Sequence, residues 1–276
     1  MRRARDDIRA FLSRYPDCVA VEVARVKGSA PREAGAWMLV SREGIFRTIG
    51  GGQLEYMAID HARKILAGGS SDPMDVPLGP EIGQCCGGRV GLDFQRVDQG
   101  LTAELIGRID AEIATRPHVY VFGAGHVGDA LAYALSLAPV RVVLVDTRES
   151  ELLAADAPGV ETCLTAMPEQ LVRSAPSGSA FIILTYDHAL DFLIATEALQ
   201  RGDAAYVGMI GSKTKKATFR NWLKREMDGG DALFENLVCP IGGALVKDKR
   251  PEIIAALVTA EVLSAVLAPA RAAQSS

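Results

Sequence analysis

One ten-residue segment constrains the fold of this chain more than any other. Residues 119–128 read Val-Tyr-Val-Phe-Gly-Ala-Gly-His-Val-Gly, an apolar run followed by a Gly-x-Gly-x-x-Gly turn that opens a helical pattern. Asp146 ends the next apolar run, about 20 residues further on, as dinucleotide-binding folds require. In such folds the glycines admit a pyrophosphate at a helix N-terminus, and the carboxylate meets ribose hydroxyls. The segment predicts a nucleotide-binding type of α/β fold, with Gly123, Gly125, Gly128 and Asp146 as candidate binding residues.

The glycine turn does not identify its ligand, because such a fold can persist after its ligand has been lost or exchanged. The polar residues around the turn also allow more than one interpretation. Arg148, two residues after Asp146, leaves any preference between NAD and NADP undecided. His126, inside the turn, either reaches a ligand from the helix N-terminus or bonds to a neighbouring loop. Asp187 and His188 follow a later apolar run, and they form either an acid–base pair or a helix cap beside a surface histidine.

The pattern of apolar runs changes near residue 100. The runs at 119–122, 140–145, 181–185 and 206–210 alternate with helical patterns, which predicts a parallel sheet covered on both faces. Before residue 98, short apolar runs are separated by clusters of glycine, which predicts a small α+β domain with long loops. We expect an N-terminal α+β domain over residues 1–97, a connector helix over residues 98–116, and a Rossmann-like parallel-sheet domain over residues 117–276.

Composition and charge narrow the class of protein. The chain has 276 residues, of which 49% are hydrophobic, which is enough for a substantial core. The formal net charge of −4 argues against a protein that holds nucleic acid through its phosphates. Five cysteines, an odd number, do not suggest a disulfide framework. With neither a secretory signal nor a membrane span in the sequence pattern, we expect a cytoplasmic protein.

A pair of adjacent cysteines is the second unusual feature. Cys85 and Cys86 lie in the segment Ile-Gly-Gln-Cys-Cys-Gly-Gly-Arg, residues 82–89. Thiolates suit soft metals and sulfur transfer, and N–H groups exposed by flanking glycines suit an anion. Adjacent cysteines do not readily chelate one metal and no Cys-x-x-Cys partner exists, which disfavours a zinc site. The pair is either a functional thiol site or two small buried side chains.

Two further loops in the first hundred residues have anion-binding character. Residues 27–35 combine Gly, Ser and Pro with two cations, one of them Arg32, and form either a clamp for a phosphate or carboxylate or an ordinary turn. Residues 49–55, Ile-Gly-Gly-Gly-Gln-Leu-Glu, place exposed N–H groups at a helix start. The sequence contains no nucleophilic serine elbow, Walker lysine motif or His-Glu-x-x-His.

Together these segments resemble the XdhC/CoxI family, the accessory proteins of xanthine dehydrogenase and related molybdenum hydroxylases. The resemblance rests on residues 28–32, 49–55, 79–88, 123–128, 206–213 and 239–242, which occur in family order. Its most specific part is Gln-Cys-Cys-Gly-Gly combined with the Gly-x-Gly-His turn. After Cys-Pro-Ile-Gly at 239–242, similar proteins have further glycines where this chain has Leu245 and Asp248. That departure weakens the case for a close approach of this loop to a ligand.

The resemblance implies a cofactor chaperone, not an enzyme with its own turnover. Such a protein binds molybdenum cofactor, protects it while a terminal oxo ligand is exchanged for sulfur, and delivers it to apo xanthine dehydrogenase. The implied partners are a cysteine desulfurase and the cofactor-binding subunit of xanthine dehydrogenase. The residues expected at the cofactor are Arg32, Gly51, Gly52, Gln53, Gln84, Cys85, Cys86, Gly87, Gly88, Gly123, Gly125, His126, Gly128, Asp146 and His188, with Cys85 and Cys86 as candidates for the metal. The alternatives are an NAD(P)-dependent oxidoreductase and a nucleotide-binding regulatory protein.

The last helical pattern points to assembly. From Pro251 to about Leu267 the chain is apolar on more than one face, so packing on a single sheet leaves apolar surface uncovered. A second subunit or the N-terminal domain can cover it. We expect a symmetric homodimer.

Overall fold

The structure, a computed structural model, describes residues 2–79, 87–227, 230–243 and 246–268. The chain divides into two compact units, Arg2–Ala111 and Glu112–Ser276. The division falls within helix α3 (Gln99–Ala114), inside the range where the sequence predicts a connector helix.

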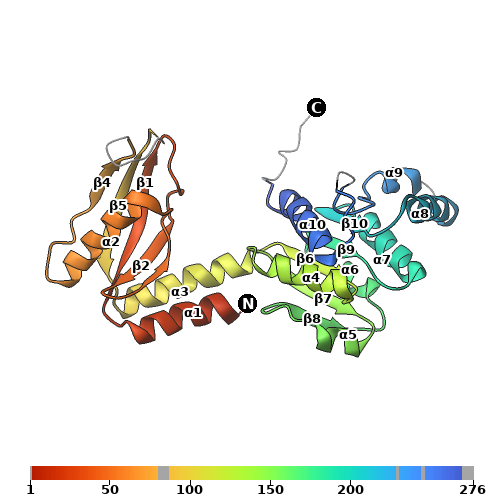
Figure 1. Cartoon of the computed structure of the whole chain (residues 1–276), viewed down its shortest axis with the longest axis horizontal. Coiled ribbons are helices and arrows are strands. Elements are labelled where there is room, and N and C mark those ends of the chain that lie inside the picture. Colours follow the sequence, from red (N-terminus) through yellow and green to blue (C-terminus); the bar gives the residue numbers. More distant parts are fainter. Residues whose placement is uncertain (1, 80–86, 228–229, 244–245, 269–276) are drawn as a thin grey trace. The chain divides into compact units, whose positions relative to one another are not determined.

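The first unit is built on an antiparallel sheet. Its strands are β1 (Cys18–Lys27), β2 (Trp37–Ser41), β3 (Ile45–Arg47), β4 (Met74–Pro77) and β5 (Arg89–Arg96), in the order β3-β2-β1-β5-β4. Helix α2 (Gly52–Leu66) packs on one face of this sheet (Figure 1), where alternate residues of β1 meet Leu54 and Ala58 of the helix in one core. Helix α1 (Arg2–Arg14) and α3 complete the unit. These elements confirm the predicted small α+β domain.

The second unit is built on a parallel sheet. Its strands are β6 (His118–Phe122), β7 (Arg141–Asp146), β8 (Glu161–Leu164), β9 (Ala180–Ile183) and β10 (Tyr206–Met209), in the order β10-β9-β6-β7-β8. Its helices are α4 (His126–Ser136), α5 (Glu149–Ala154), α6 (Glu169–Ser174), α7 (His188–Gln200), α8 (Lys213–Glu226), α9 (Gly230–Phe234) and α10 (Pro251–Val266). The Rossmann-like parallel sheet predicted for this half is confirmed.

Each face of the parallel sheet has its own core, because successive side chains of a strand point to opposite faces. Val119 and Val121 of β6 pack with side chains of α4 and α10, whereas Tyr120 and Phe122 pack with those of α6, α7 and α8. Burial on both faces explains why these strands are nearly continuous apolar runs.

Helix α10 lies against α4 and β10 in this unit (Figure 1). Ala255, Val258 and Val262 are buried there, while Leu267 at its C-terminal end is 48% exposed. The predicted homodimer stays a prediction. Among the helices of the described residues, none is long and apolar enough to cross a membrane.

Candidate functional site

The glycine turn between β6 and α4 is shaped mainly by contacts within the chain. A Cβ at Gly123 would overlap the carbonyl oxygen of Leu184, and one at Gly128 would overlap the carbonyl oxygen of Gly123. Gly123 also has a φ of +114°, which side-chain-bearing residues rarely adopt. Gly125 differs, because no atom beyond its own neighbours in the chain lies within 4 Å of the position of its Cβ. Of the three glycines, Gly125 is the one that faces open space.

Asp146, at the end of β7, is bonded to this turn. Its side chain is buried and accepts hydrogen bonds from the backbone N–H of Ala124 at 2.7 Å and of Arg148 at 2.9 Å. The Arg148 guanidinium donates two more, at 3.0 and 3.1 Å. Burial acts to raise the pKa of Asp146, but the hydrogen bonds from the Arg148 side chain and the two N–H groups outweigh it, so the pKa is lowered.

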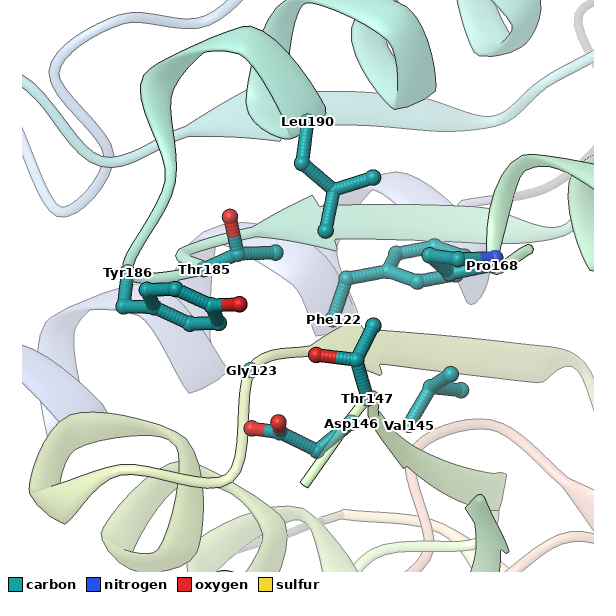
Figure 2. Close-up of a pocket in the computed structure, with 9 residues that line it drawn as sticks. All are labelled: Phe122, Gly123, Val145, Asp146, Thr147, Pro168, Thr185, Tyr186 and Leu190. Atoms are coloured by element: carbon teal, nitrogen blue, oxygen red, sulfur yellow. The ribbon is translucent and has the colours of Figure 1, made fainter. Parts of the chain in front are cut away.

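The crevice beside Asp146 has little free volume. It is lined by nine residues, among them Gly123, Thr147 and Tyr186, and encloses about 10 Å³, the space of one water molecule. Figure 2 shows Thr185 and Tyr186 on one side of the crevice and Asp146 and Thr147 on the other. The Arg148 guanidinium lies 4.4 Å from the centre of the Tyr186 ring. A ribose at Asp146 has to displace Arg148 and Tyr186, and the role of Asp146 toward a ribose stays a prediction.

The two histidines predicted at the cofactor are exposed at helix starts. Asp187 is the N-cap of α7, and its carboxylate accepts a hydrogen bond from the N–H of Ala189 at 2.8 Å. The helix-cap interpretation of Asp187 is therefore confirmed, and His188 stands exposed as the first residue of α7. His126 is likewise the exposed first residue of α4.

Sequence reasoning missed a buried ion pair at the same edge of the sheet. Asp191 in α7 is fully buried, and its Oδ2 pairs with Nζ of Lys215 in α8, whose side chain is 8% exposed. The other carboxylate oxygen accepts hydrogen bonds from Thr185, at 2.9 Å from the backbone N–H and 2.7 Å from the hydroxyl. This network joins the loop after β9 to the starts of two helices. No sequence spacing links these residues, so no motif announces the pair.

A second and much larger pocket lies at the carboxyl end of β10. It has a volume of about 670 Å³ and is lined in part by the loop that follows Cys-Pro-Ile-Gly, including Lys247, Asp248 and Lys249. From Leu245 and Asp248, which stand where similar proteins have glycines, we did not expect this loop to approach a ligand closely. The structure places residues 246–249 of this loop in a pocket wall.

In the first unit, the predicted anion-binding loops lie next to one another. Ser29 forms a parallel bridge with Gly87, and a Cβ at Gly88 would overlap the carbonyl oxygen of Ser29. A Cβ at Gly50 would lie 2.5 Å from Cβ of Pro31 and 3.1 Å from Cγ of Arg32. The loops that carry Arg32, Gly51 and Gly52, and Gly87 and Gly88 therefore meet. Residues 80–86, with Gln84, Cys85 and Cys86, lie outside the described residues.

The glycine turn at the start of α2 already holds a carboxylate of the chain. Oε2 of Glu55 accepts hydrogen bonds from the N–H of Ile49 at 3.0 Å, from the N–H of Gly51 at 3.1 Å and from the Thr48 hydroxyl. Gln53, in the first turn of α2, and Arg32, in the neighbouring loop, are exposed. Arg32 forms no ion pair with any residue that the structure describes. An incoming anion therefore competes with Glu55 for the turn and can pair with the exposed Arg32.

Comparisons with known proteins agree with this architecture. The family model "XdhC and CoxI family" matches residues 12–75, and the family model "XdhC Rossmann domain" matches residues 119–262, more than half of the chain. A solved structure described as a xanthine dehydrogenase from Bacillus halodurans is 17% identical, with a TM-score of 0.78, and covers 98% of this chain and 97% of that chain. At this identity the likeness shows the fold alone. No curated protein matches the chain.

Proposed function

The chain belongs to the XdhC and CoxI family, and from this premise we propose that it is an accessory protein of xanthine dehydrogenase maturation. In this proposal it binds molybdenum cofactor, supports its sulfuration and delivers it to apo xanthine dehydrogenase. The observation that carries the proposal is that family models match in both compact units. Each of the two compact units therefore resembles the corresponding domain of this family.

The carboxylates at the carboxyl edge of the parallel sheet are held by partners within the chain. At the carboxyl edge of the parallel sheet, the carboxylate of Asp146 is bonded to Arg148, that of Asp191 to Lys215, and that of Asp187 to the backbone of α7. A general base needs a carboxylate or imidazole within reach of a substrate proton. Because the three carboxylates have partners, the exposed His126 and His188 are the residues left for that role in the oxidoreductase alternative. The crevice at Asp146 holds about one water molecule, so a ribose there has to displace Arg148 and Tyr186.

Molybdenum cofactor contributes a pterin, a phosphate, a dithiolene and the metal. The described residues offer matching partners for the organic part. Arg32 is exposed beside glycine loops in the first unit, and the second unit has a pocket that combines apolar and cationic side chains. For the metal end, the family resemblance points to Cys85 and Cys86. We propose a cysteine desulfurase and the cofactor-binding subunit of xanthine dehydrogenase as partners, a homodimer as the assembly, and the cytoplasm as the location.

Copurification tests the proposal. The chain is purified after coexpression with the cofactor-synthesis pathway, and bound molybdenum, pterin and nicotinamide are measured. We expect molybdenum and pterin to copurify, and to be absent when the chain comes from a strain without the pathway. Nicotinamide without molybdenum would contradict the proposal and favour the oxidoreductase. Cys85→Ala and Cys86→Ala test the metal end, with less molybdenum retained as the expected result.

Delivery is tested separately with purified components. The loaded chain, a cysteine desulfurase with a sulfur source, and apo xanthine dehydrogenase are mixed, and xanthine oxidation is measured. Activation should need all three. Activation at the same rate by free cofactor would contradict a role in delivery.

A further inference from the structure

We propose that the pocket at the carboxyl end of β10 binds the phosphate ester of a flat heterocycle. The ring lies against the apolar wall, and the phosphate lies at Lys247 and Lys249. The inference rests on the proposed function only for the identity of the heterocycle, which would then be the pterin of molybdenum cofactor.

The size and walls of the pocket suit a ring. Its volume of about 670 Å³ falls in the range of small-molecule sites. Val127 of α4, Ile210 after β10, and Ile254 and Leu257 of α10 contribute to an apolar wall. Ile254 and Leu257 are half-buried, so part of the surplus apolar surface predicted for this helix faces the pocket. Walls of this kind favour an apolar or aromatic group.

The charges at the rim select an anion. Lys247 and Lys249 are exposed, and neither has an ion-pair partner in the part of the chain that the structure describes. Asp248 stands between them, but the Arg250 guanidinium holds its carboxylate with contacts of 2.6 to 3.1 Å. Arg250 therefore neutralises Asp248, and two lysine charges remain for a ligand. Charge-assisted hydrogen bonds from ammonium groups to phosphate are the strong kind.

Two helices begin at this pocket. Val127 is the second residue of α4, and Ser212 is the N-cap of α8. The first turn of a helix has N–H groups without intrahelical partners and a partial positive charge. Both features add to the preference of the lysines for an anion, and α4 begins directly after the open Gly125.

One wall of the pocket is fixed in advance by Glu261 of α10. Its Oε2 accepts hydrogen bonds from the N–H of Gly242 at 2.8 Å and from the Tyr206 hydroxyl at 2.9 Å. These bonds hold the loop at Gly242 against α10. A wall that is ordered before binding lowers the entropy lost on binding.

The test is a titration of the purified chain with 6-hydroxymethylpterin phosphate, followed by pterin fluorescence, in buffer without inorganic phosphate. The unphosphorylated pterin, inorganic phosphate and AMP are the comparison ligands. We expect the phosphopterin to bind with a dissociation constant below about 1 mM, and at least about tenfold more tightly than the unphosphorylated pterin. Comparison with AMP shows whether the pocket prefers a phosphorylated pterin or a nucleotide.

Two variants place binding in the pocket. Lys247→Ala with Lys249→Ala should weaken binding of the phosphopterin about tenfold or more. Val246→Trp should block the ring, because Val246 lines the pocket and is 47% exposed, so the larger side chain fits without unfolding the chain. The matched controls are Lys64→Ala with Lys224→Ala, which removes two exposed lysines elsewhere, and Leu153→Trp at a site that is 79% exposed. Both controls should bind like the parent.

The outcomes separate the pocket from the proposed function. Failure of both phosphopterin and AMP to bind below about 1 mM, or equal binding by parent and pocket variants, overturns the inference. AMP binding that depends on the two lysines supports the pocket but overturns the pterin as its ring. If molybdenum copurifies equally with the parent and the double lysine variant, the cofactor is held elsewhere. That result overturns the pterin of molybdenum cofactor as the ligand of this pocket, while the proposed function stands. If the chain binds phosphopterin in the pocket but retains no molybdenum, the pocket inference stands and the proposed function fails.

Discussion

Each of the two units contains a glycine-rich turn at the start of a helix. In each unit, backbone N–H groups of the turn donate hydrogen bonds to a carboxylate of the same unit. In the first unit Glu55 accepts hydrogen bonds from Ile49 and Gly51, and in the second Asp146 accepts one from Ala124. The units differ in what is left free. Arg32 is exposed beside the first turn, whereas Arg148 at the second turn is bonded to Asp146. A glycine-rich turn therefore predicts backbone geometry, and the neighbouring side chains decide whether an anion finds room.

The largest expected loss of stability is at glycines whose Cβ would overlap backbone atoms, in contrast to Gly125, where there is space for a Cβ. Gly128→Ala should destabilise the second unit by about 4 kcal/mol, because its Cβ would overlap the carbonyl oxygen of Gly123 and backbone cannot yield easily. Gly88→Ala should act similarly in the first unit, against Ser29. Urea unfolding measures both. Loss of less than about 1 kcal/mol in Gly128→Ala would show that the turn relaxes and that the comparison of glycines is wrong.

The next effect compares a buried ion pair with a half-exposed one. Lys215→Met should destabilise the chain by about 3 kcal/mol, because it leaves the fully buried Asp191 without its cation. In the first unit, Arg108 pairs with Glu22 at 2.7 Å, but both side chains are more than one-third exposed. Arg108→Met should cost only about 0.5 kcal/mol. Equal losses in urea unfolding would contradict the role assigned to burial.

A smaller effect concerns the carboxylate on the second turn. Asp146→Asn should destabilise the chain by about 1.5 kcal/mol at neutral pH, because hydrogen bonds to a charged acceptor become bonds to a neutral one. The folded-state pKa of Asp146 is lowered, so this stabilisation is complete above the ordinary pKa of the carboxyl and disappears as the pH falls through the lowered value. The parent and variant should therefore converge in stability on acidification. A difference that is constant from neutral to acidic pH would contradict this assignment.

The smallest effect on stability is expected at Gly125. Gly125→Ala should change the free energy of unfolding by less than about 0.5 kcal/mol, because φ is −68° and no atom lies near the new Cβ. Gly125→Val, also accommodated, would project into any ligand at the start of α4. Reduced cofactor retention with unchanged stability would show that a ligand approaches there. Full retention of the cofactor by Gly125→Val would show that the turn has a structural role only and that no ligand approaches it.

The strands show how far the sequence pattern reaches. The central strands β6, β7 and β9 are buried on both faces, and their continuous apolar runs predicted them closely. β8 was missed because it lies at the sheet edge and three of its four residues are exposed. A strand with few buried residues leaves little hydrophobic signal.

The sequence by itself determined the order of the two units, the parallel sheet of the second and the position of its glycine turn, because these depend on local periodicity and on residues close in the chain. Only the tertiary structure decided how the candidate site residues are used. It paired Asp191 with Lys215, anchored Gly242 to Glu261, and placed Lys247 and Lys249 at a pocket wall. These contacts join segments that are far apart in the chain, and hydrogen bonds and ion pairs of that kind leave no periodic pattern in a single sequence.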